Sequence, residues 1–440
     1  MKVLKFGGTS VGSAQRMKDV AKLITGDRKI VVLSAMSGTT NSLVEISDYL
    51  YKKNPDGANE IINKLAMKYM GHVEELYSTE EYKQKAKELI KSHFEYIRTF
   101  TKDLFTLFEE KVVLAQGELI STGMMNLYLN ECGVKSVLIP ALDYMRTDKN
   151  AEPDPVYIKE KLVKLLADNK DADLYITQGY ICRNAYGEID NLQRGGSDYS
   201  ASLIGAAIGA EEIQIWTDID GMHDNDPRVV DKTSPVRQLH FEEAAELAYF
   251  GAKILHPTCI QPAKYANIPV RLLNTMEPTA PGTLISNDTE KGKIKAVAAK
   301  DNITAIKIKS SRMLLAHGFL RKVFEIFESY QTPIDMVCTS EVGVSMSIDN
   351  TKHLNEIVND LKKYGTVTVD HDMCIVCVVG DLEWENVGFE AKALDAMREI
   401  PVRMISFGGS NYNISFLIRE SDKKQALQSL SNVLFNGKEK

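Results

Sequence analysis

The chain has 440 residues, of which 44% are hydrophobic and 26% charged, and its formal net charge is −7. This length favours about two to four domains, and the composition is that of an ordinary globular protein. An acidic balance without dense lysine and arginine runs argues against duplex DNA as a partner. No stretch approaches the roughly 18 apolar residues of a membrane span, and residues 1–5 hold no signal-peptide core. We therefore expect a cytoplasmic location, with no nucleic-acid or membrane partner.

Residues 1–285 alternate apolar, β-rich runs with helical periodicity, which predicts an α/β domain with helices on both faces of a mainly parallel sheet. A long, charged, amphipathic stretch, Thr79–Gly117, predicts one or two long helices over that sheet. The expected strands are Lys2–Phe6, Lys29–Ser34, Ser136–Pro140, Ala172–Gln178, Glu212–Thr217 and Val270–Leu273.

The chain changes character after Pro281-Gly282. Residues 286–300 are polar and lysine-rich, which predicts a linker. Residues 301–371 then follow the β-α-β-β-α-β order of a ferredoxin-like unit, and a similar order begins again over 372–440. No clear sixth strand remains for the second copy, so the two copies either follow one another or interleave.

The segment Lys5–Val11, KFGGTSV, links the first expected strand to a helix that begins near Gln15. Gly7 and Gly8 allow backbone N–H groups to approach an anion closely, a helix N-terminus favours negative charge, and Lys5 adds a positive one. The segment predicts a phosphate-binding turn, and the alternative is a tight turn without a ligand. It is neither a Walker A loop nor a dinucleotide fingerprint.

Two further turns carry groups suited to a ligand. Ser34 and Thr40 lie in a Ser/Gly/Thr turn after the second strand, which either holds an anion or caps a helix. Glu118 follows Gly117 in what reads as a hydroxyl-rich turn. Its carboxylate either binds an ammonium or supports the first turn of a helix.

The segment Arg194-Gly195-Gly196-Ser197-Asp198 predicts a glycine loop before a helix that Ser197 caps. Arg194 offers a planar fork for a carboxylate, and Asp198 can orient a cationic side chain. A purely structural glycine turn is the alternative. The acidic loop from Thr217 to Arg228 lacks EF-hand spacing and fits a nucleotide-facing loop better.

Cysteine and histidine positions do not predict a metal site. The six cysteines and eight histidines are dispersed. Cys374 and Cys377 have CxxC spacing, but they lie in an apolar run where strand geometry points them to opposite faces. We expect both to be buried small side chains.

These segments, in this order and spacing, resemble the aspartokinases of the amino acid kinase family, over essentially the whole chain. The resemblance implies a three-layer αβα sandwich with a mainly parallel sheet, residues 1–285. It also implies two ferredoxin-like ACT domains, residues 301–371 and 372–440, which bind amino acids. The family converts L-aspartate to 4-phospho-L-aspartate with ATP and Mg²⁺, at the entry to lysine, threonine and methionine synthesis.

The resemblance also implies residue roles. Lys5 and Asp198 would be catalytic, with Lys5 steadying the transferred phosphoryl group and Asp198 orienting Lys5. The aspartate-binding residues would be Ser34, Thr40, Glu118, Arg194 and Ser197. The residues around ATP would be Lys5, Gly7, Gly8, Thr217, Asp218, His223, Asp226, Arg228 and Lys253. His223 stands where many relatives have tyrosine.

The first ACT unit resembles the effector site of lysine-inhibited aspartokinases, so lysine is the expected effector. Residues implied there are Met313, Ala316, Gly318, Phe319, Leu320, Asp335, Thr339, Ser340 and Glu341. Ala316 stands where some relatives have serine. The alternative is a dimerisation module without a ligand. The family's ACT units pair between chains, which implies a homo-oligomer.

The chemistry of the site agrees with this resemblance. An aspartate side chain with a pKa near 3.9 is ionised at neutral pH, so the nucleophile needs no general base. The site instead needs positive charge and alignment against an anionic triphosphate. Two other functions stay open: another carboxylate kinase of the same fold, and a catalytically silent amino-acid sensor.

Overall fold

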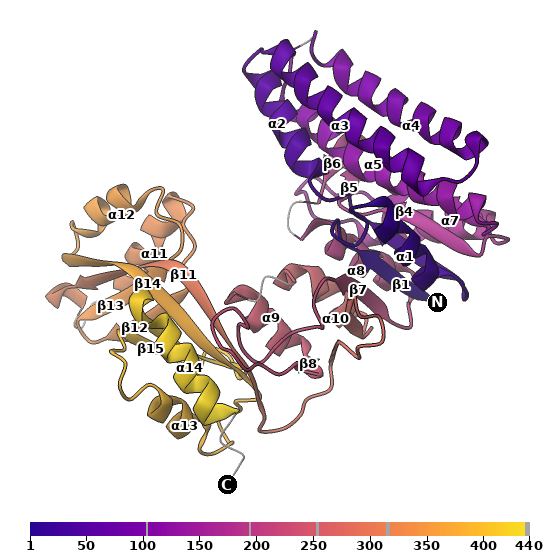
Figure 1. Ribbon diagram of the computed structural model, residues 1–440. Helices are drawn as coiled ribbons and strands as arrows, with labels where there is room; N and C mark the ends of the chain where they lie inside the picture. Colours follow the sequence, from indigo (N-terminus) through magenta and orange to yellow (C-terminus); the bar gives the residue numbers. More distant parts are fainter. Residues whose placement is uncertain (103, 193–194, 252–254, 314–316, 436–440) are drawn as a thin grey trace. The chain divides into compact units, whose positions relative to one another are not determined.

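The computed structural model describes residues 1–102, 104–192, 195–251, 255–313 and 317–435. The chain forms two compact units, the first made of residues 1–222 and 254–287, the second of residues 223–253 and 288–440. Each unit has its own sheet (Figure 1). In the part of the chain that the structure describes, no helix is long and apolar enough to cross a membrane.

The first unit supplies seven neighbouring strands of a mainly parallel sheet, in the order β3-β4-β2-β1-β7-β9-β10. The pairings from β3 to β9 are parallel, and β10 runs antiparallel to β9. All six strands expected in this region are confirmed, and β10 is a further one. Their bounds are β1 Lys2–Phe6, β2 Lys29–Leu33, β3 Ser136–Leu138, β4 Leu174–Gln178, β7 Ile213–Thr217, β9 Val270–Asn274 and β10 Thr283–Ser286.

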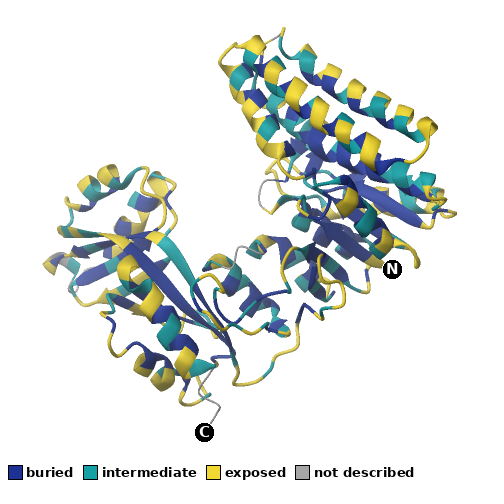
Figure 2. Ribbon diagram, viewed as in Figure 1, coloured by how far each residue is buried: buried dark blue, intermediate teal, exposed yellow. Residues whose placement is uncertain are grey.

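Helices cover both faces of this sheet because its central strands are apolar on both sides. Leu4, Phe6, Val31 and Leu33 pack into one core with five helices, and the alternate strand residues face the other way, toward α8. Figure 2 shows these strands buried. The five helices are α1 Ala14–Ile24, α2 Thr39–Tyr51, α3 Pro55–Leu76, α4 Glu80–Thr99 and α5 Leu107–Glu131. The remaining helices are α6 Ala141–Tyr144, α7 Pro155–Asp168, α8 Gly196–Ile208 and α10 Gln261–Tyr265, and a short hairpin joins β5 Ile181–Arg183 to β6 Ile189–Asn191.

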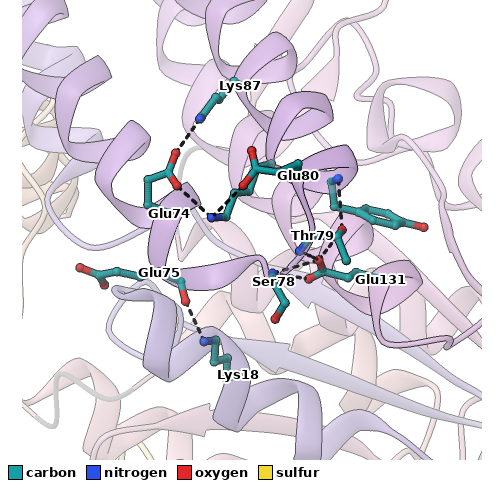
Figure 3. A network of polar contacts seen from close by, with 10 residues as sticks. Lys18, Glu74, Glu75, Ser78, Thr79, Glu80, Lys87 and Glu131 are labelled. Atoms are coloured by element: carbon teal, nitrogen blue, oxygen red, sulfur yellow. Dashed lines mark hydrogen bonds and ion pairs between the residues drawn. The ribbon is translucent and has the colours of Figure 1, made fainter.

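The stretch Thr79–Gly117, expected to form one or two long helices, contains α4 and the beginning of α5. The helical region is longer than expected, because α3 precedes this stretch and α5 continues beyond it. A polar network ties the turn between α3 and α4 to neighbouring helices (Figure 3). Glu74 pairs with Lys83 and Lys87, and Glu131 accepts hydrogen bonds from the backbone of Ser78 and Thr79.

The second unit is built on one antiparallel sheet with the order β12-β13-β11-β14-β16-β15. Its strands are β11 Ile294–Lys309, β12 Met336–Ser340, β13 Gly343–Ile348, β14 Thr366–Gly380, β15 Met404–Ser406 and β16 Asn413–Arg419. Its helices are α9 Phe241–Tyr249, α11 Phe319–Ser329, α12 Leu354–Leu361, α13 Phe389–Ala396 and α14 Lys423–Leu434; the short strand β8 Gln238–His240 precedes α9. Cys374 and Cys377 are buried in β14, as expected.

The two ferredoxin-like halves interleave through β11 and β14. These strands pair from Ile294 opposite Gly380 to Lys309 opposite Thr366. Each contains one residue with positive φ near its middle, Asn302 (59°) and Asp372 (54°), and the register shifts between Lys300 and Ile303. Asn and Asp tolerate this conformation, so a bulge can form there without breaking the strand.

The expected linker at 286–300 is therefore wrong over its second half. Residues 294–300 form the start of β11 and supply the strand that the second ferredoxin-like half lacked in sequence order. Local sequence could not show this, because the strand precedes the first half and joins the second only through tertiary pairing. The segment 223–253, expected within the first domain, is grouped with the second unit, where α9 contacts β11 and β14.

Candidate active site and effector region

A pocket of about 520 Å³ lies in the first unit, at the carboxyl ends of β1 and β2. Ligands of open parallel sheets usually bind at this edge. The pocket is lined by Lys5, Gly8, Thr9, Ser34, Ala35, Met36, Ser37, Gly38, Thr40, Asn41, Glu118, Tyr180, Gly195, Gly196 and Ser197. The structure thus brings together residues that are far apart in the chain and that the sequence predicts for phosphate and for aspartate.

Lys5 forms an ion pair with Asp198 at this pocket. The Nζ–Oδ1 distance is 2.8 Å, and the two side chains are only 11% and 15% exposed. Lys5 lies on β1 between Val32 of β2 and Ile215 of β7, so the sheet fixes where its side chain starts. An ammonium held by one carboxylate keeps protons available for a bound anion.

Two helix N-termini meet at the same pocket. α2 begins after Gly38 (φ 82°) and α8 after Gly195 (φ 68°), and neither helix has a side-chain cap. Glycine suits both positions because it adopts positive φ without strain. Uncapped helix N-termini and a lysine together form a setting for an anion.

Close packing explains the glycine after the first strand. A Cβ on Gly8 would lie 2.7 Å from the carbonyl oxygen of Ala35, so no side chain fits there. Ser34 donates a hydrogen bond to Ser197, with an Oγ–Oγ distance of 2.9 Å. The expected N-cap role of Ser197 is wrong, because α8 begins at Gly196, two residues earlier than expected, and Gly195 is its N-cap.

Glu118 lies in the middle of α5, so the expected hydroxyl-rich turn and first-turn position are both wrong. Its neighbours Gly117 and Ser121 are buried helix residues that pack inward. Glu118 is 5% exposed and accepts a hydrogen bond from the backbone N–H of Ala35 at 3.3 Å. Burial raises the pKa of Glu118 to about 7.

Tyr180 is a lining residue that sequence reasoning missed. It has a positive φ of 68°, which is uncommon for an aromatic residue. Its backbone N–H donates to Ser200 Oγ at 2.9 Å, and its ring meets the space beside Gly196. In the sequence, only the position of Tyr180 directly after Gly179 could have indicated its role. The structure shows why residue 179 is a glycine: a Cβ there would lie 2.4 Å from the Cβ of Ser197.

The residues predicted around the nucleotide are divided between the two units. Thr217 ends β7 in the first unit, and exposed Asp218 follows it. His223, Asp226 and Arg228 belong to the second unit. There His223 Nδ1 lies 2.8 Å from Thr233 Oγ1, and Asp226 pairs with Arg228 at 2.8 Å.

Three predicted residues, Arg194, Lys253 and Ala316, lie outside the described residues. Over the ranges that are described, no group of three or more His, Cys, Asp or Glu could hold a metal ion.

The predicted effector residues lie at two places in the second unit, around the N-terminus of α11 and on or beside β12. α11 begins after Gly318 (φ 80°), again without a side-chain cap. Gly318 and Leu320 are exposed, whereas Phe319 is buried and Met313 half-buried. On the β12 side, Thr339, Ser340 and Glu341 are exposed.

Asp335 differs from these exposed residues, because its side chain is 2% exposed and already paired. Lys300 Nζ lies 2.7 Å from Asp335 Oδ1 and 2.9 Å from Asp349 Oδ2. The hydroxyl of Tyr249 donates to the same Oδ1 at 2.7 Å, and Lys300 sits 4.3 Å from the centre of the Tyr249 ring. The other oxygen of Asp335, Oδ2, is buried without a hydrogen-bond partner among the described residues.

An open parallel sheet with a lysine and two helix N-termini at its carboxyl edge is the architecture of a phosphate-binding α/β protein. Known families agree: the amino acid kinase family matches residues 1–274, and the ACT domain matches residues 376–434. Aspartokinase 1, chloroplastic, of Arabidopsis thaliana is 35% identical over 98% of this chain and 80% of its own length. The lysine-sensitive aspartokinase 3 of Escherichia coli is 31% identical over 98% of this chain and 99% of its own.

Solved structures give the same answer. Escherichia coli aspartokinase III in complex with aspartate and ADP has a TM-score of 0.84 and 31% identity, covering 99% of this chain and 100% of that one. The same enzyme in complex with lysine and aspartate has a TM-score of 0.80 and 32% identity, covering 99% of each chain. The chain therefore belongs to the amino acid kinase family and, within it, to the aspartokinases. The predicted family, fold class and kinase activity are confirmed.

Proposed function

We propose that the pocket at β1 and β2 transfers the γ-phosphoryl group of ATP to the side-chain carboxylate of L-aspartate, giving 4-phospho-L-aspartate. One observation carries this proposal: Lys5 and the N-termini of α2 and α8 line the same pocket as the buried carboxylate of Glu118. The positive groups suit phosphate, and the carboxylate suits an amino-acid ammonium. The Escherichia coli relative in complex with aspartate and ADP supports this choice of substrates.

On the phosphate side, Lys5 would neutralise the transferred group. Asp198 holds its ammonium at 2.8 Å and thereby aims it. Gly7 and Gly8 lie at the carboxyl end of β1, where backbone N–H groups can approach the triphosphate. Catalysis of this kind depends on alignment and fixed positive charge rather than on proton transfer.

On the aspartate side, Glu118 would bind the α-ammonium, and its burial strengthens that interaction. Thr40, Ser34 and Ser197 line the pocket with hydroxyl groups that can donate to the substrate's carboxylates. Arg194 would pair with one carboxylate. The attacking carboxylate is already ionised at neutral pH, so none of these residues has to act as a general base.

The proposed nucleotide residues are Thr217, Asp218, His223, Asp226, Arg228 and Lys253. Asp198 is occupied by Lys5, and the described residues form no carboxylate cluster for Mg²⁺. A magnesium ion would therefore be held mainly by the phosphate oxygens of ATP, as this ion commonly is. The cytoplasmic location stays a prediction.

We propose lysine as an inhibitory effector of the second unit. The uncapped N-terminus of α11 and its neighbours Met313 and Leu320 suit the effector's carboxylate and chain, and Glu341 suits an ammonium. At Asp335 only Oδ2 is left for a second ammonium, since Lys300 and Tyr249 occupy Oδ1. The relative in complex with lysine and aspartate supports this assignment.

We also propose that the chain is a homo-oligomer joined through its ACT sheet. β12 and β15 lie side by side, where Cys338 Sγ donates to the Ile405 carbonyl at 3.1 Å. Val337 and Ile405 on these strands, and Phe407 just beyond β15, are large apolar residues that stay well exposed. Light scattering of the purified chain would give the oligomer size, and a monomer would contradict this part.

The experiment that tests the function is hydroxylamine trapping of the acyl phosphate formed from L-aspartate, ATP and Mg²⁺, with and without L-lysine. Activity that lysine suppresses would support both the substrate and the effector. Activity that lysine leaves unchanged would keep the substrate and contradict the effector. Turnover with another carboxylate but not with aspartate would contradict the substrate.

A further inference from the structure

The loop between β2 and α2, residues 34–38, forms one wall of the pocket together with Thr40. The start of α2 has no side-chain cap, because its N-cap is Gly38. The position of the wall must come from neighbouring elements.

Two consecutive residues of the helix α3, Lys68 and Tyr69, form hydrogen bonds to this wall. Lys68 Nζ donates to the carbonyl oxygen of Ser37 at 2.9 Å. The hydroxyl of Tyr69 lies 2.8 Å from the hydroxyl of Thr39, the residue before Thr40, and both side chains are fully buried. The two contacts bracket Gly38, the residue where the chain turns into α2.

The helix α5 also contacts this wall, at Ala35 and Thr39. A Cβ on Gly117 would lie 2.8 Å from the side chain of Ala35 and 3.2 Å from that of Thr39, so the two elements are in close contact. Glu118 accepts the backbone N–H of Ala35. Contacts from both α3 and α5 therefore fix the position of the wall, and the hydrogen bond to Glu118 is one of them.

The helix α3 is itself anchored, so it can act as a support. The Tyr69 ring packs against His72 and Phe94, with centroid distances of 6.4 and 5.9 Å. At the far end of α3, the network of Figure 3 fixes Glu74 and the turn that follows. Tyr77 adds a hydrogen bond from its hydroxyl to the carbonyl of Met124 at 2.7 Å.

We infer that Lys68 and Tyr69 are positioning residues for substrate binding, which set the pocket wall from Ser37 to Thr40 without touching the substrate. This inference rests on the proposed function, since Thr40 and Glu118 are the proposed aspartate contacts. Loss of the Tyr69 hydroxyl leaves the Thr39 hydroxyl buried without its partner and frees the start of α2. The helical stretch from α3 to α5 then serves to shape the aspartate side of the pocket.

The test compares Tyr69→Phe with Tyr144→Phe by steady-state kinetics. Tyr144 is a matched control, because its hydroxyl also lies 2.8 Å from a threonine hydroxyl, that of Thr177, and is equally buried. The difference lies in the partner: Thr39 stands between two lining residues, Gly38 and Thr40, whereas Thr177 is not next to any lining residue. We expect Tyr69→Phe to raise KM for aspartate about tenfold, with KM for ATP and kcat nearly unchanged. Tyr144→Phe should leave all three constants near the wild-type values.

A second pair of variants separates positioning from loss of stability. Lys68→Met should raise KM for aspartate, and Lys68→Arg, which can still donate to the Ser37 carbonyl, should restore it. Because Lys68 is exposed, neither change should lower the melting temperature appreciably.

If the wild type is active and Tyr69→Phe behaves like Tyr144→Phe, the inference is overturned and the proposed function stands. An equal rise of KM for ATP in the Tyr69 variant would also overturn it, because the loss would then be general. A wild type without acyl phosphate formation overturns the proposed function and the inference with it.

Discussion

Two buried lysine–aspartate pairs, one in each unit, show how the same two residue types can serve different purposes. Lys5 and Asp198 lie 2.8 Å apart in the first unit, and Lys300 and Asp335 lie 2.7 Å apart in the second. The resemblance to aspartokinases implies that Asp198 orients Lys5 and that Asp335 belongs to the effector site. Their surroundings separate them.

The Lys5 pair borders a pocket, whereas the Lys300 pair is satisfied from several sides. Lys300 also contacts Asp349 at 2.9 Å and the ring of Tyr249 at 4.3 Å. Burial alone would lower the pKa of Lys300, but hydrogen bonds to Asp335 and Asp349 outweigh it and raise that pKa above its usual value. A lysine with its donors fully engaged stabilises structure, and a lysine with donors to spare can bind a ligand.

The largest expected effect comes from Lys5→Met. The loss of the only full positive charge that lines the pocket, among the described residues, should lower kcat by about a hundred- to a thousandfold. KM for aspartate should change far less, because Glu118 is untouched. Hydroxylamine-trapped acyl phosphate gives both constants, and near-normal turnover would remove the distinction between the two pairs.

Lys300→Met is the corresponding change in the second unit and should act on stability instead. It leaves Asp335 buried with no cation, which should lower the free energy of unfolding by about 3–5 kcal/mol. Turnover without an effector should stay at the wild-type level. Urea unfolding followed by circular dichroism checks the first expectation, and a loss of kcat comparable to that of Lys5→Met would contradict the second.

A third buried carboxylate, Glu118, gives a pH-dependent prediction. Its pKa is raised by burial to about 7, and the proposed contact with the aspartate ammonium needs the ionised form. KM for aspartate should therefore rise about tenfold for each pH unit below 7 and level off above it. Glu118→Gln should bind aspartate weakly without this dependence. A flat wild-type profile between pH 6 and pH 8 would exclude Glu118 as the ammonium ligand.

The same carboxyl gives a stability effect of known sign. Its pKa in the folded state lies above the unfolded value of 4.5, so the folded protein binds the proton more tightly. The contribution of Glu118 to stability is thus present below pH 4.5 and is lost as the pH rises toward 7. Thermal unfolding of wild type and Glu118→Gln across this range would show the difference.

Tyr249→Phe should have the smallest effect. It removes one hydrogen bond to Asp335 but keeps the ring beside Lys300, so the free energy of unfolding should fall by about 1 kcal/mol. Urea unfolding of Tyr249→Phe, compared with that of Lys300→Met, measures how much of the stabilisation of Asp335 comes from the Tyr249 hydroxyl. A loss as large as that of Lys300→Met would mean that the hydroxyl, rather than the charge, holds Asp335.

The family, the parallel sheet and most of the pocket could be predicted from the sequence. The segments at Lys5, Ser34 and Gly195 each end a strand or begin a helix, and strand ends of a parallel sheet meet at one edge. Their convergence follows from local patterns alone. Local patterns also marked the strands of both ferredoxin-like halves except the one at residues 294–300, because period-two apolar alternation is a property of neighbouring residues.

Tertiary structure decided the rest. Glu118 reads as a turn residue because Gly117 interrupts a helical pattern, but that glycine is required where α5 packs on Ala35 and Thr39. Residues 294–300 read as a linker because their strand partners, in β14, come some 80 residues later in the chain. The partner of Asp335 could not be foreseen either, since Lys300 reaches it only through the folded sheet. Local sequence fixes backbone tendencies, whereas the partner of a buried charge is fixed by which elements the fold brings together.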